Sequence, residues 1–233
     1  QKLAGLVSEI KAGHRLAITL SVGEMEKEDY RLLREAGADR FLLRFETSDR
    51  KLFSAMKPDA DYDARISCLR RLRETGFQVG SGIMVGLPGQ TLESIADDIM
   101  LFRELELDMV GIGPFIPDPD TPLAGKPGGT ALLALKTVAL TRIVTQNTHM
   151  PATTALGSID PLGRQKALQC GANVLMPNVS PRAVRRHYKL YPGKICIDEQ
   201  AGDCSACTAA MLEGLGRFRA EGPGHSLKSR KTD

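Results

Sequence analysis

The sequence has no apolar run long enough to cross a membrane and no large excess of charge of either sign. No stretch reaches the roughly 18 to 20 apolar residues that a membrane-spanning helix needs, and no signal peptide opens the chain. Lysine and arginine outnumber aspartate and glutamate by only 31 to 28, and the charges are mixed along the chain. We therefore expect a soluble, cytoplasmic protein that binds neither nucleic acid nor a membrane.

Cysteine is scarce, and the number of cysteines is odd. Five cysteines occur in 233 residues, and three of them lie between positions 196 and 207. A chain of this length, with 42% hydrophobic residues, buries a full core without disulfide bonds. We therefore expect reduced thiols or metal ligands.

Two phosphate-binding motifs are also absent. No Gly-x-Gly-x-x-Gly follows the first apolar run, and the glycine-rich segment 80–91 lacks the Gly-Lys-Ser/Thr of a P-loop. In segments 80–91 and 109–117, glycines instead interrupt apolar strands. Such strands either let a ligand approach the backbone closely or pack tightly in a core.

What the sequence does have is a regular alternation of strand-like and helix-like segments. Apolar runs of strand length lie at 16–20, 40–44, 78–85, 109–114, 151–154 and 173–176. Helical spacing of apolar residues is found at 27–36, 62–74, 92–105, 132–144 and 163–169. Gly37, Gly76 and Gly171 stand where a helix ends before the next strand. The pattern predicts a parallel sheet covered by helices.

Polar or special residues follow nearly every predicted strand, which favours a closed α/β barrel over an open sheet with a single crevice. We predict a (β/α)8 TIM-type barrel of which this chain holds about six βα units, strands three to eight. Because the chain opens in a helical pattern at 3–11, we expect the first units upstream. Residues 1–180 would form the partial barrel, 181–215 a cysteine-containing extension, and 216–233 a basic, disordered tail.

The clearest candidate site residues follow the second predicted strand. Arg44 and Glu46 are two positions apart, so a strand places both on one side, near the mouth of the barrel. The alternative is a purely structural ion pair. Arg65, in the first turns of the next predicted helix, can bind a ligand carboxylate there or be an ordinary exposed arginine. Thr153 and Thr154 at a later strand end either bind an anion or cap a helix.

Cys196, Cys204 and Cys207 give the clearest indication of a metal site, because three thiolates lie within twelve residues. Three protein ligands leave one coordination position open. Zinc with a fourth ligand elsewhere, an iron–sulfur cluster with an exchangeable position, and a cluster of free thiols are the alternatives.

Several short motifs, one at each strand end and in this order, resemble the HydE-type maturases of [FeFe]-hydrogenase. They lie at 21–24, 43–47, 84–91, 108–117, 151–155, 176–178 and 191–196. The resemblance runs from about residue 16 to residue 207. Two positions depart from the family pattern: Val22 stands where a cysteine is common, and Phe45 where a histidine is common.

The resemblance implies a radical S-adenosylmethionine enzyme. In that family a [4Fe–4S] cluster on a Cys-x3-Cys-x2-Cys loop reductively cleaves S-adenosylmethionine to a 5′-deoxyadenosyl radical. This sequence contains no such loop, so we expect the chain alone to be inactive. By resemblance, Glu46 would hold the amino group of S-adenosylmethionine and Arg65 its carboxylate, and Met109 and Ile112 would border the nucleoside.

The resemblance also implies a substrate and a second cluster. The substrate would be a small organometallic or amino-acid-derived molecule, an iron–carbonyl–cyanide–cysteine precursor of the diiron subcluster, and other hydrogenase maturases would be partners. The residues expected to line its cavity are Thr19, Ser21, Arg40, Arg44, Thr153, Thr154 and Tyr191. The three clustered cysteines would hold an auxiliary [2Fe–2S] or [4Fe–4S] cluster. The competing hypotheses are a methylornithine or biotin synthase-like barrel, and a non-catalytic metal-binding scaffold.

Overall fold

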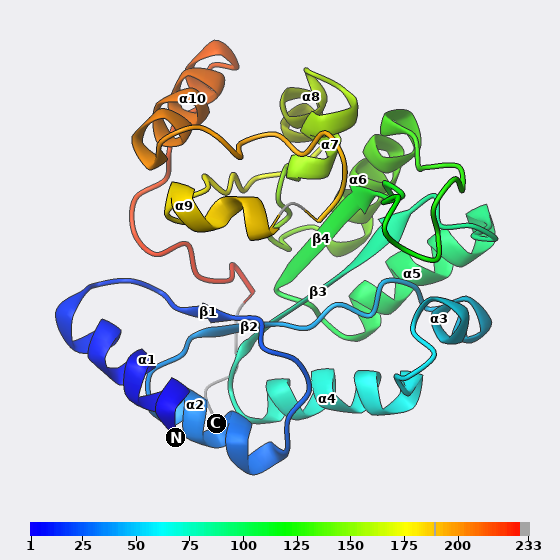
Figure 1. Ribbon diagram of the computed structural model, residues 1–233. Helices are drawn as coiled ribbons and strands as arrows, with labels where there is room; N and C mark the ends of the chain where they lie inside the picture. Colours follow the sequence, from blue (N-terminus) through cyan, green and yellow to red (C-terminus); the bar gives the residue numbers. More distant parts are fainter. Residues whose placement is uncertain (189, 229–233) are drawn as a thin grey trace.

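The computed structural model describes residues 1–188 and 190–228. Its centre is a parallel sheet of strands β1 (Thr19–Leu20), β2 (Arg40–Leu42), β3 (Gln78–Val85) and β4 (Met109–Pro114). The strands lie side by side in chain order, β1-β2-β3-β4, and every pair is parallel (Figure 1). Consecutive order with a helical connection each time is the arrangement of a (β/α) barrel.

Helices alternate with these strands along the chain. In order they are α1 (Lys2–Gly13), α2 (Lys27–Glu35), α3 (Arg50–Met56), α4 (Tyr62–Glu74), α5 (Leu92–Glu104), α6 (Ala131–Thr145), α7 (Thr154–Ile159), α8 (Gly163–Gln169), α9 (Arg182–Arg185) and α10 (Ala201–Gly214), with a 3-10 turn at Arg186–Tyr188. Among the described residues no helix is long and apolar enough to span a membrane.

The predicted helices are confirmed, α4 and α8 with the bounds that the apolar spacing indicated. Gly37, Gly76 and Gly171 all have positive φ, as their place between helix and strand requires. The sequence pattern missed α3, α7, α9 and α10. The first three have only seven, six and four residues, too short for an apolar period to show. The fourth has few apolar residues on a single face.

The last two predicted strands are present only as isolated bridges. His149 pairs with Met109, and Pro151 pairs with Val174, both in parallel. These bridges continue the sheet beyond β4 in chain order, so the described residues form an open arc of a barrel. The single-residue pairings correct the expectation of full strands at 151–154 and 173–176.

The core lies between the sheet and its helices. Along β2 and its extension, Phe41, Leu43 and Phe45 are buried, and the Phe45 ring lies 5.6 Å from that of Phe102 in α5. These alternate residues therefore face the helices, and the residues between them, including Arg44, face the inner side of the arc. The alternation puts the charged side chains of this strand on the barrel's inner side.

The C-terminal segment does not run free of the sheet. After α10 the chain turns back to the amino ends of the strands (Figure 1), where Arg40 donates hydrogen bonds to the carbonyl oxygens of Pro223 and Gly224. Gln78 also bonds His225 (2.7 Å) and accepts from the Ser226 amide (2.8 Å). These contacts correct the expectation of a wholly disordered tail over 216–233. Of the predicted basic tail, 229–233 fall outside the described residues.

Candidate active site

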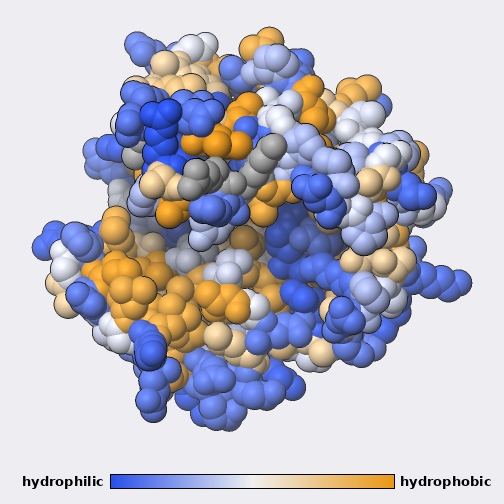
Figure 2. Space-filling model, viewed as in Figure 1, coloured by the Kyte–Doolittle hydropathy of each residue, from blue (hydrophilic) through white to orange (hydrophobic). Residues whose placement is uncertain are grey.

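A pocket with a volume of about 750 Å³ lies at the carboxyl ends of the strands. Figure 2 shows the surface hollowed near the centre of this face. The pocket is lined from the segment after β2, β3, β4 and the connection after it, α3, α7 and the C-terminal extension by Arg44, Glu46, Ala55, Met56, Pro58, Met84, Gly113, Pro114, Phe115, Ile116, Asp118, Thr121, Pro122, Leu123, Thr153, Thr154, Ala155, Leu190, Tyr191 and Lys194. It combines charged groups with an apolar wall.

Arg44 and Glu46 form a two-pronged ion pair in this pocket, which confirms that they share one side of the strand. Arg44 Nε lies 2.8 Å from Glu46 Oε1, and Arg44 Nη2 lies 2.9 Å from Glu46 Oε2. Glu46 has a φ of 68°, in the left-handed region, and its backbone bridges to Ile83. The pair is partly buried, with side chains 30% and 13% exposed, so it is more than a solvated surface contact.

Two strand glycines make room for the Arg44 guanidinium. A Cβ at Gly82 would lie 2.7 Å from Arg44 Nη1, and one at Gly111 would lie 2.5 Å away. The guanidinium also donates to the carbonyl oxygens of Gly111 (3.2 Å) and Ile83 (2.7 Å). At Gly82 and Gly111 the space beside the strand is therefore occupied by the Arg44 side chain of the same protein.

Arg65 reaches the same end of the sheet from the first turn of α4. Its Nε lies 2.7 Å from Glu24 Oε1, and its Nη1 donates to the carbonyl oxygen of Arg44 (3.3 Å). Its side chain is 14% exposed, which contradicts the reading of an ordinary exposed arginine. Arg65 is not among the residues that line the pocket.

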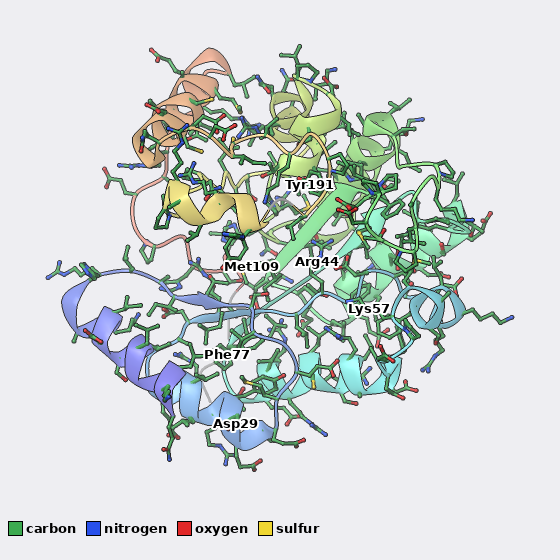
Figure 3. The ribbon with its side chains drawn as sticks, viewed as in Figure 1. Asp29, Arg44, Lys57, Phe77, Met109 and Tyr191 are labelled. Carbon is green, nitrogen blue, oxygen red and sulfur yellow. The ribbon has the colours of Figure 1, made fainter. Side chains whose placement is uncertain are left out.

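Lys57 is a half-buried cation that the sequence analysis did not single out. It directly follows α3, and Figure 3 places it near Arg44 on the α3 side. Burial lowers the pKa of Lys57, the negative charge of Glu46 raises it, and the positive charges of Arg65 and Arg44 lower it further. The sequence did contain an indication of this cation, because a lysine lies in the connection after β2. Such connections form the sites of barrel proteins at the carboxyl ends of the strands.

Thr153 and Thr154 line the pocket as expected, and Thr153 also caps a helix. Thr153 Oγ1 accepts from the Leu156 amide at the start of α7 (3.4 Å). Thr154 accepts, through its carbonyl oxygen, the hydroxyl of Ser158 (3.0 Å). Thr153 therefore caps a helix, which was one of the two alternatives. Because Thr153 and Thr154 both line the pocket, a ligand role for their hydroxyls stays a prediction.

Tyr191 and Lys194 bring the C-terminal extension into the pocket wall. Burial raises the pKa of Tyr191, a hydrogen bond with Ser158 lowers it, and Cys196 raises it. Lys194 Nζ donates to the carbonyl oxygen of Tyr188 (2.6 Å). Tyr191, expected to line the substrate cavity, lines this pocket, and its contact with a substrate stays a prediction.

The other predicted ligand contacts lie outside this pocket. Thr19 pairs with Arg40 at the amino ends of β1 and β2, and Met109 begins β4, at the same end of the sheet. Ser21 follows β1 and is exposed. Ile112 is 1% exposed in the core, so only its backbone, next to pocket residue Gly113, approaches the mouth. Met109 and Ile112 are not among the residues that line this pocket, and their contact with a nucleoside stays a prediction.

The clustered cysteines are only partly assembled. Burial, and then the adjacent Cys204, raise the pKa of Cys196, and Cys204 Sγ accepts from the Asn178 amide (3.1 Å). Cys207 is exposed, and all five cysteines are free thiols. Within residues 1–188 and 190–228, no group of three or more His, Cys, Asp or Glu side chains is placed to hold a metal ion. The auxiliary cluster stays a prediction.

Comparisons with known proteins show what the chain is similar to. Residues 1–102 match the model of the Radical SAM superfamily. The chain is 49% identical over 98% of its length to the [FeFe] hydrogenase maturase subunit HydE of Thermotoga maritima, and it covers 64% of that protein. It is 30% identical over 73% of its length to the 3-methylornithine synthase of Methanosarcina acetivorans, and covers 48% of that protein.

Solved structures support the fold. Methylornithine synthase (PylB) superposes on 94% of the chain, which covers 64% of that structure, with a TM-score of 0.78 at 24% identity. The maturase HydG from Carboxydothermus hydrogenoformans superposes on 92%, the chain covering 51% of it, with a TM-score of 0.68 at 15% identity.

Sheet order, a pocket at the carboxyl ends of the strands and the solved structures together define a TIM-type barrel fold, and residues 1–102 match the Radical SAM superfamily. Within that superfamily the chain is similar to a HydE subunit, at 49% identity. It spans about two thirds of the length of the HydE relative, 64%.

Proposed function

We propose that the protein is a radical S-adenosylmethionine enzyme of [FeFe]-hydrogenase maturation. The observation that carries the proposal is the 49% identity to a HydE subunit over 98% of the chain. That similarity extends over the strands, the pocket and the C-terminal extension. A free-thiol protein of this kind fits the reducing cytoplasm.

The pocket suits the cofactor by size and by its polar groups. Its volume of about 750 Å³ lies within the range of ligand sites, roughly 300 to 1,000 Å³. Met84, Phe115 and Ile116 supply an apolar wall for a purine. Glu46 accepts two bonds from Arg44, and because a carboxylate has about four acceptor positions, it can also accept an ammonium group.

In this proposal the chain's residues divide the work of binding. Glu46 accepts the amino group of S-adenosylmethionine, and Arg65, which is paired with Glu24, contributes positive charge toward its carboxylate. The [4Fe–4S] cluster of this superfamily supplies, when bound, the electron that cleaves the cofactor. Cys196, Cys204 and Cys207 would hold the auxiliary cluster.

The substrate would lie deeper in the same pocket. We propose an iron–carbonyl–cyanide–cysteine precursor of the diiron subcluster, with Arg44, Thr153, Thr154 and Tyr191 as its contacts. The support is that these polar groups converge on one cavity from three separate parts of the chain. Other maturases would pass on the substrate or receive the product.

The experiment is an activity assay on protein that carries the Cys-x3-Cys-x2-Cys loop of the superfamily. Reductive cleavage of S-adenosylmethionine, together with activation of an [FeFe]-hydrogenase in the presence of the partner maturases, is the expected result. Formation of methylornithine from lysine would contradict it and favour the second candidate. That candidate has its own support, because methylornithine synthase shares the fold with a TM-score of 0.78.

A third outcome bears on the scaffold hypothesis. Protein that binds iron but neither binds nor cleaves S-adenosylmethionine would be a metal-binding scaffold. Calorimetric titration with S-adenosylmethionine separates that outcome from an enzyme whose substrate has been misassigned.

A further inference from the structure

The C-terminal segment is fixed at two points across the amino ends of the strands, at the end of the sheet opposite the pocket. Arg40, at the start of β2, donates hydrogen bonds to the carbonyl oxygens of Pro223 and Gly224. Further along, Lys228 Nζ donates to the carbonyl oxygen of Leu107 (2.6 Å). The part of the segment between these two points is held by side chains that can gain or lose a proton.

His149 is a hydrogen-bond donor of fixed form at this end. Asn173 Oδ1 accepts from the Met150 amide (2.8 Å), so Asn173 Nδ2 donates to His149 Nδ1 (3.1 Å). The hydrogen of the neutral ring is therefore on Nε2, which donates to the carbonyl oxygen of His225 (2.9 Å). The two bonds of Asn173 do not involve the C-terminal segment, so His149 keeps this form whether or not the segment is docked.

His225 differs, because the bond to its ring exists only when the segment is docked. Gln78 Oε1 accepts from the Ser226 amide (2.8 Å), which leaves Gln78 Nε2 facing His225 Nδ1 (2.7 Å). The NH2 of an amide only donates, so Nδ1 must offer a lone pair. The docked imidazole of His225 is therefore neutral, whereas in a released segment it is free to take up a proton.

Protonation of His225 is incompatible with these bonds. A proton on Nδ1 would point at the NH2 of Gln78. Turning the Gln78 amide over would bring its oxygen to the imidazolium, but would then set its NH2 against the N–H of Ser226. Either way one hydrogen bond is replaced by two donors that face each other.

The charged groups beside His225 act with opposite signs. Asp39 interacts with His225 and favours an imidazolium, but its carboxylate is already bound by Lys11 (3.0 Å) and by the Ile18 amide (2.8 Å). Arg40 donates to the carbonyl oxygen of the residue before His225 and disfavours a second positive charge there.

The charges around Lys228 also offset one another. The acids Asp108 and Glu106 and the base Arg73 act on Lys228, and Asp108 is paired with Arg73 (3.2 Å). The hydrogen bond at His225 Nδ1 therefore decides how docking of the segment responds to pH.

We propose that residues 223–228 form a pH-sensitive clasp on the amino end of the sheet, which opens when His225 takes up a proton. An imidazole in water does so at about pH 6.5. The docked segment binds fewer protons than the released one, so docking is favoured at high pH and weakens as the pH falls. If the docked ring stays neutral, the docking constant falls about tenfold between about pH 7.5 and about pH 5.5. The clasp does not depend on the proposed function.

The test is hydrogen exchange of the Ser226 amide in the full chain. It is expressed as a protection factor, so that the intrinsic pH dependence of exchange cancels. Protection should fall about tenfold between about pH 7.5 and about pH 5.5. His225→Asn offers Gln78 Nε2 an oxygen that does not titrate, and its protection should stay constant. His14→Asn, at an exposed position after α1, is the matched control and should behave as the original protein does.

Gln78→Glu separates this bond from other causes of pH dependence. A carboxylate accepts both from the Ser226 amide and from an imidazolium, so protection should rise rather than fall as the pH is lowered. Protection in the original protein that does not change with pH would overturn the proposal. So would a fall that persists in His225→Asn or that Gln78→Glu does not reverse. If the Ser226 amide is unprotected at both pH values, the segment is not docked and the proposal fails as well.

Discussion

The two ends of the parallel sheet carry similar polar side chains in very different surroundings. Arg40 and Arg44 lie on the same inner side of β2 and its extension, four residues apart. At the carboxyl end, Arg44 is paired with the side chain of Glu46 beside an open pocket. At the amino end, Arg40 donates to main-chain carbonyls of Pro223 and Gly224. One end is open and the other is occupied by the chain's own C-terminal segment.

At the amino end, several side chains are fixed by main-chain groups, beside the ion pairs Lys11–Asp39 and Arg73–Asp108. Asn173 Oδ1 accepts from the Met150 amide (2.8 Å), which turns Asn173 Nδ2 toward His149 Nδ1 (3.1 Å). His149 Nε2 in turn contacts the carbonyl oxygen of His225 (2.9 Å). Side chains whose polar atoms are already bonded to one another and to the backbone have little capacity left for a ligand. At the carboxyl end, the pair Arg44–Glu46 lines an open pocket, so these charged side chains can exchange partners when a ligand arrives.

The largest effect should come from filling the space that serves Arg44. A Cβ at Gly82 would lie 2.2 Å from the carbonyl oxygen of Gly111, so β3 and β4 must separate. We expect Gly82→Ala to lower the free energy of unfolding by about 3 kcal/mol, measured by urea denaturation. Gly5→Ala is the control, since nothing lies within 4 Å of its added Cβ, and it should be neutral or slightly stabilising. A loss below about 1 kcal/mol for Gly82→Ala would mean that this end of the sheet is not tightly packed.

A buried carboxyl group behind the carboxyl end gives a pH-dependent effect. Asp98 in α5 is fully buried and accepts from the Ser48 amide, two residues after Glu46. Burial raises the pKa of Asp98 to about 6, against the favourable bonds from Ser48. Because the folded-state pKa is above the unfolded one, the folded protein binds more protons between the two values. The contribution of Asp98 to stability is therefore greatest below about pH 4 and falls as pH rises toward 6.

Asp98→Asn should remove that dependence. We expect the substituted protein to gain, relative to the original, on the order of 2 kcal/mol between pH 4 and pH 8, read from unfolding curves at both pH values. Asp97→Asn, at an exposed neighbouring position, is the control and should show no such gain. If the difference in the free energy of unfolding between Asp98→Asn and the original protein stays constant with pH, Asp98 does not titrate in this range.

The sequence predicts the part of this contrast that rests on residues close together along the chain. The alternation along residues 40–46 is local, so the shared side of Arg44 and Glu46 was predictable, as were the helices with a clear apolar period. The contact of Arg40 with Pro223 joins residues separated by 183 positions, and no local pattern indicates it. Arg40 was therefore expected at the substrate cavity, from resemblance, and lies at the amino end.

The site shows the same limit. Lys57 has no motif of its own, and its closeness to Glu46 depends on α3, a helix of seven residues that the apolar spacing does not show. The pairing of Arg65 with Glu24 needs the packing of α4 against the connection after β1. Residue types and strand ends could be predicted. The pairing of the charged side chains could not be predicted, because it depends on how every neighbouring charge is placed in the folded protein.

A smaller effect should follow from releasing the C-terminal segment. Arg40→Met removes the donor to Pro223 and Gly224, and we expect a cost of about 1 to 2 kcal/mol. Hydrogen exchange of the Ser226 amide, which donates to Gln78 Oε1 (2.8 Å), should become faster. Arg31→Met, on the exposed side of α2, is the control. Unchanged exchange at Ser226 would indicate that the segment is held without Arg40.

The smallest expected effect distinguishes the two roles of Thr153, which stands in the pocket and caps α7. Thr153→Ala removes the acceptor for the Leu156 amide and should cost about 0.5 to 1 kcal/mol in the free energy of unfolding. Thr153→Ser keeps the hydroxyl and should recover most of that stability. Thr154→Ala is the comparison, because its side chain is not the cap. If Thr153→Ala leaves stability unchanged yet weakens ligand binding, the hydroxyl serves the open end of the sheet rather than the helix. Loss of stability without a change in binding would assign Thr153 to the scaffold, with Thr154 left as the hydroxyl for a ligand.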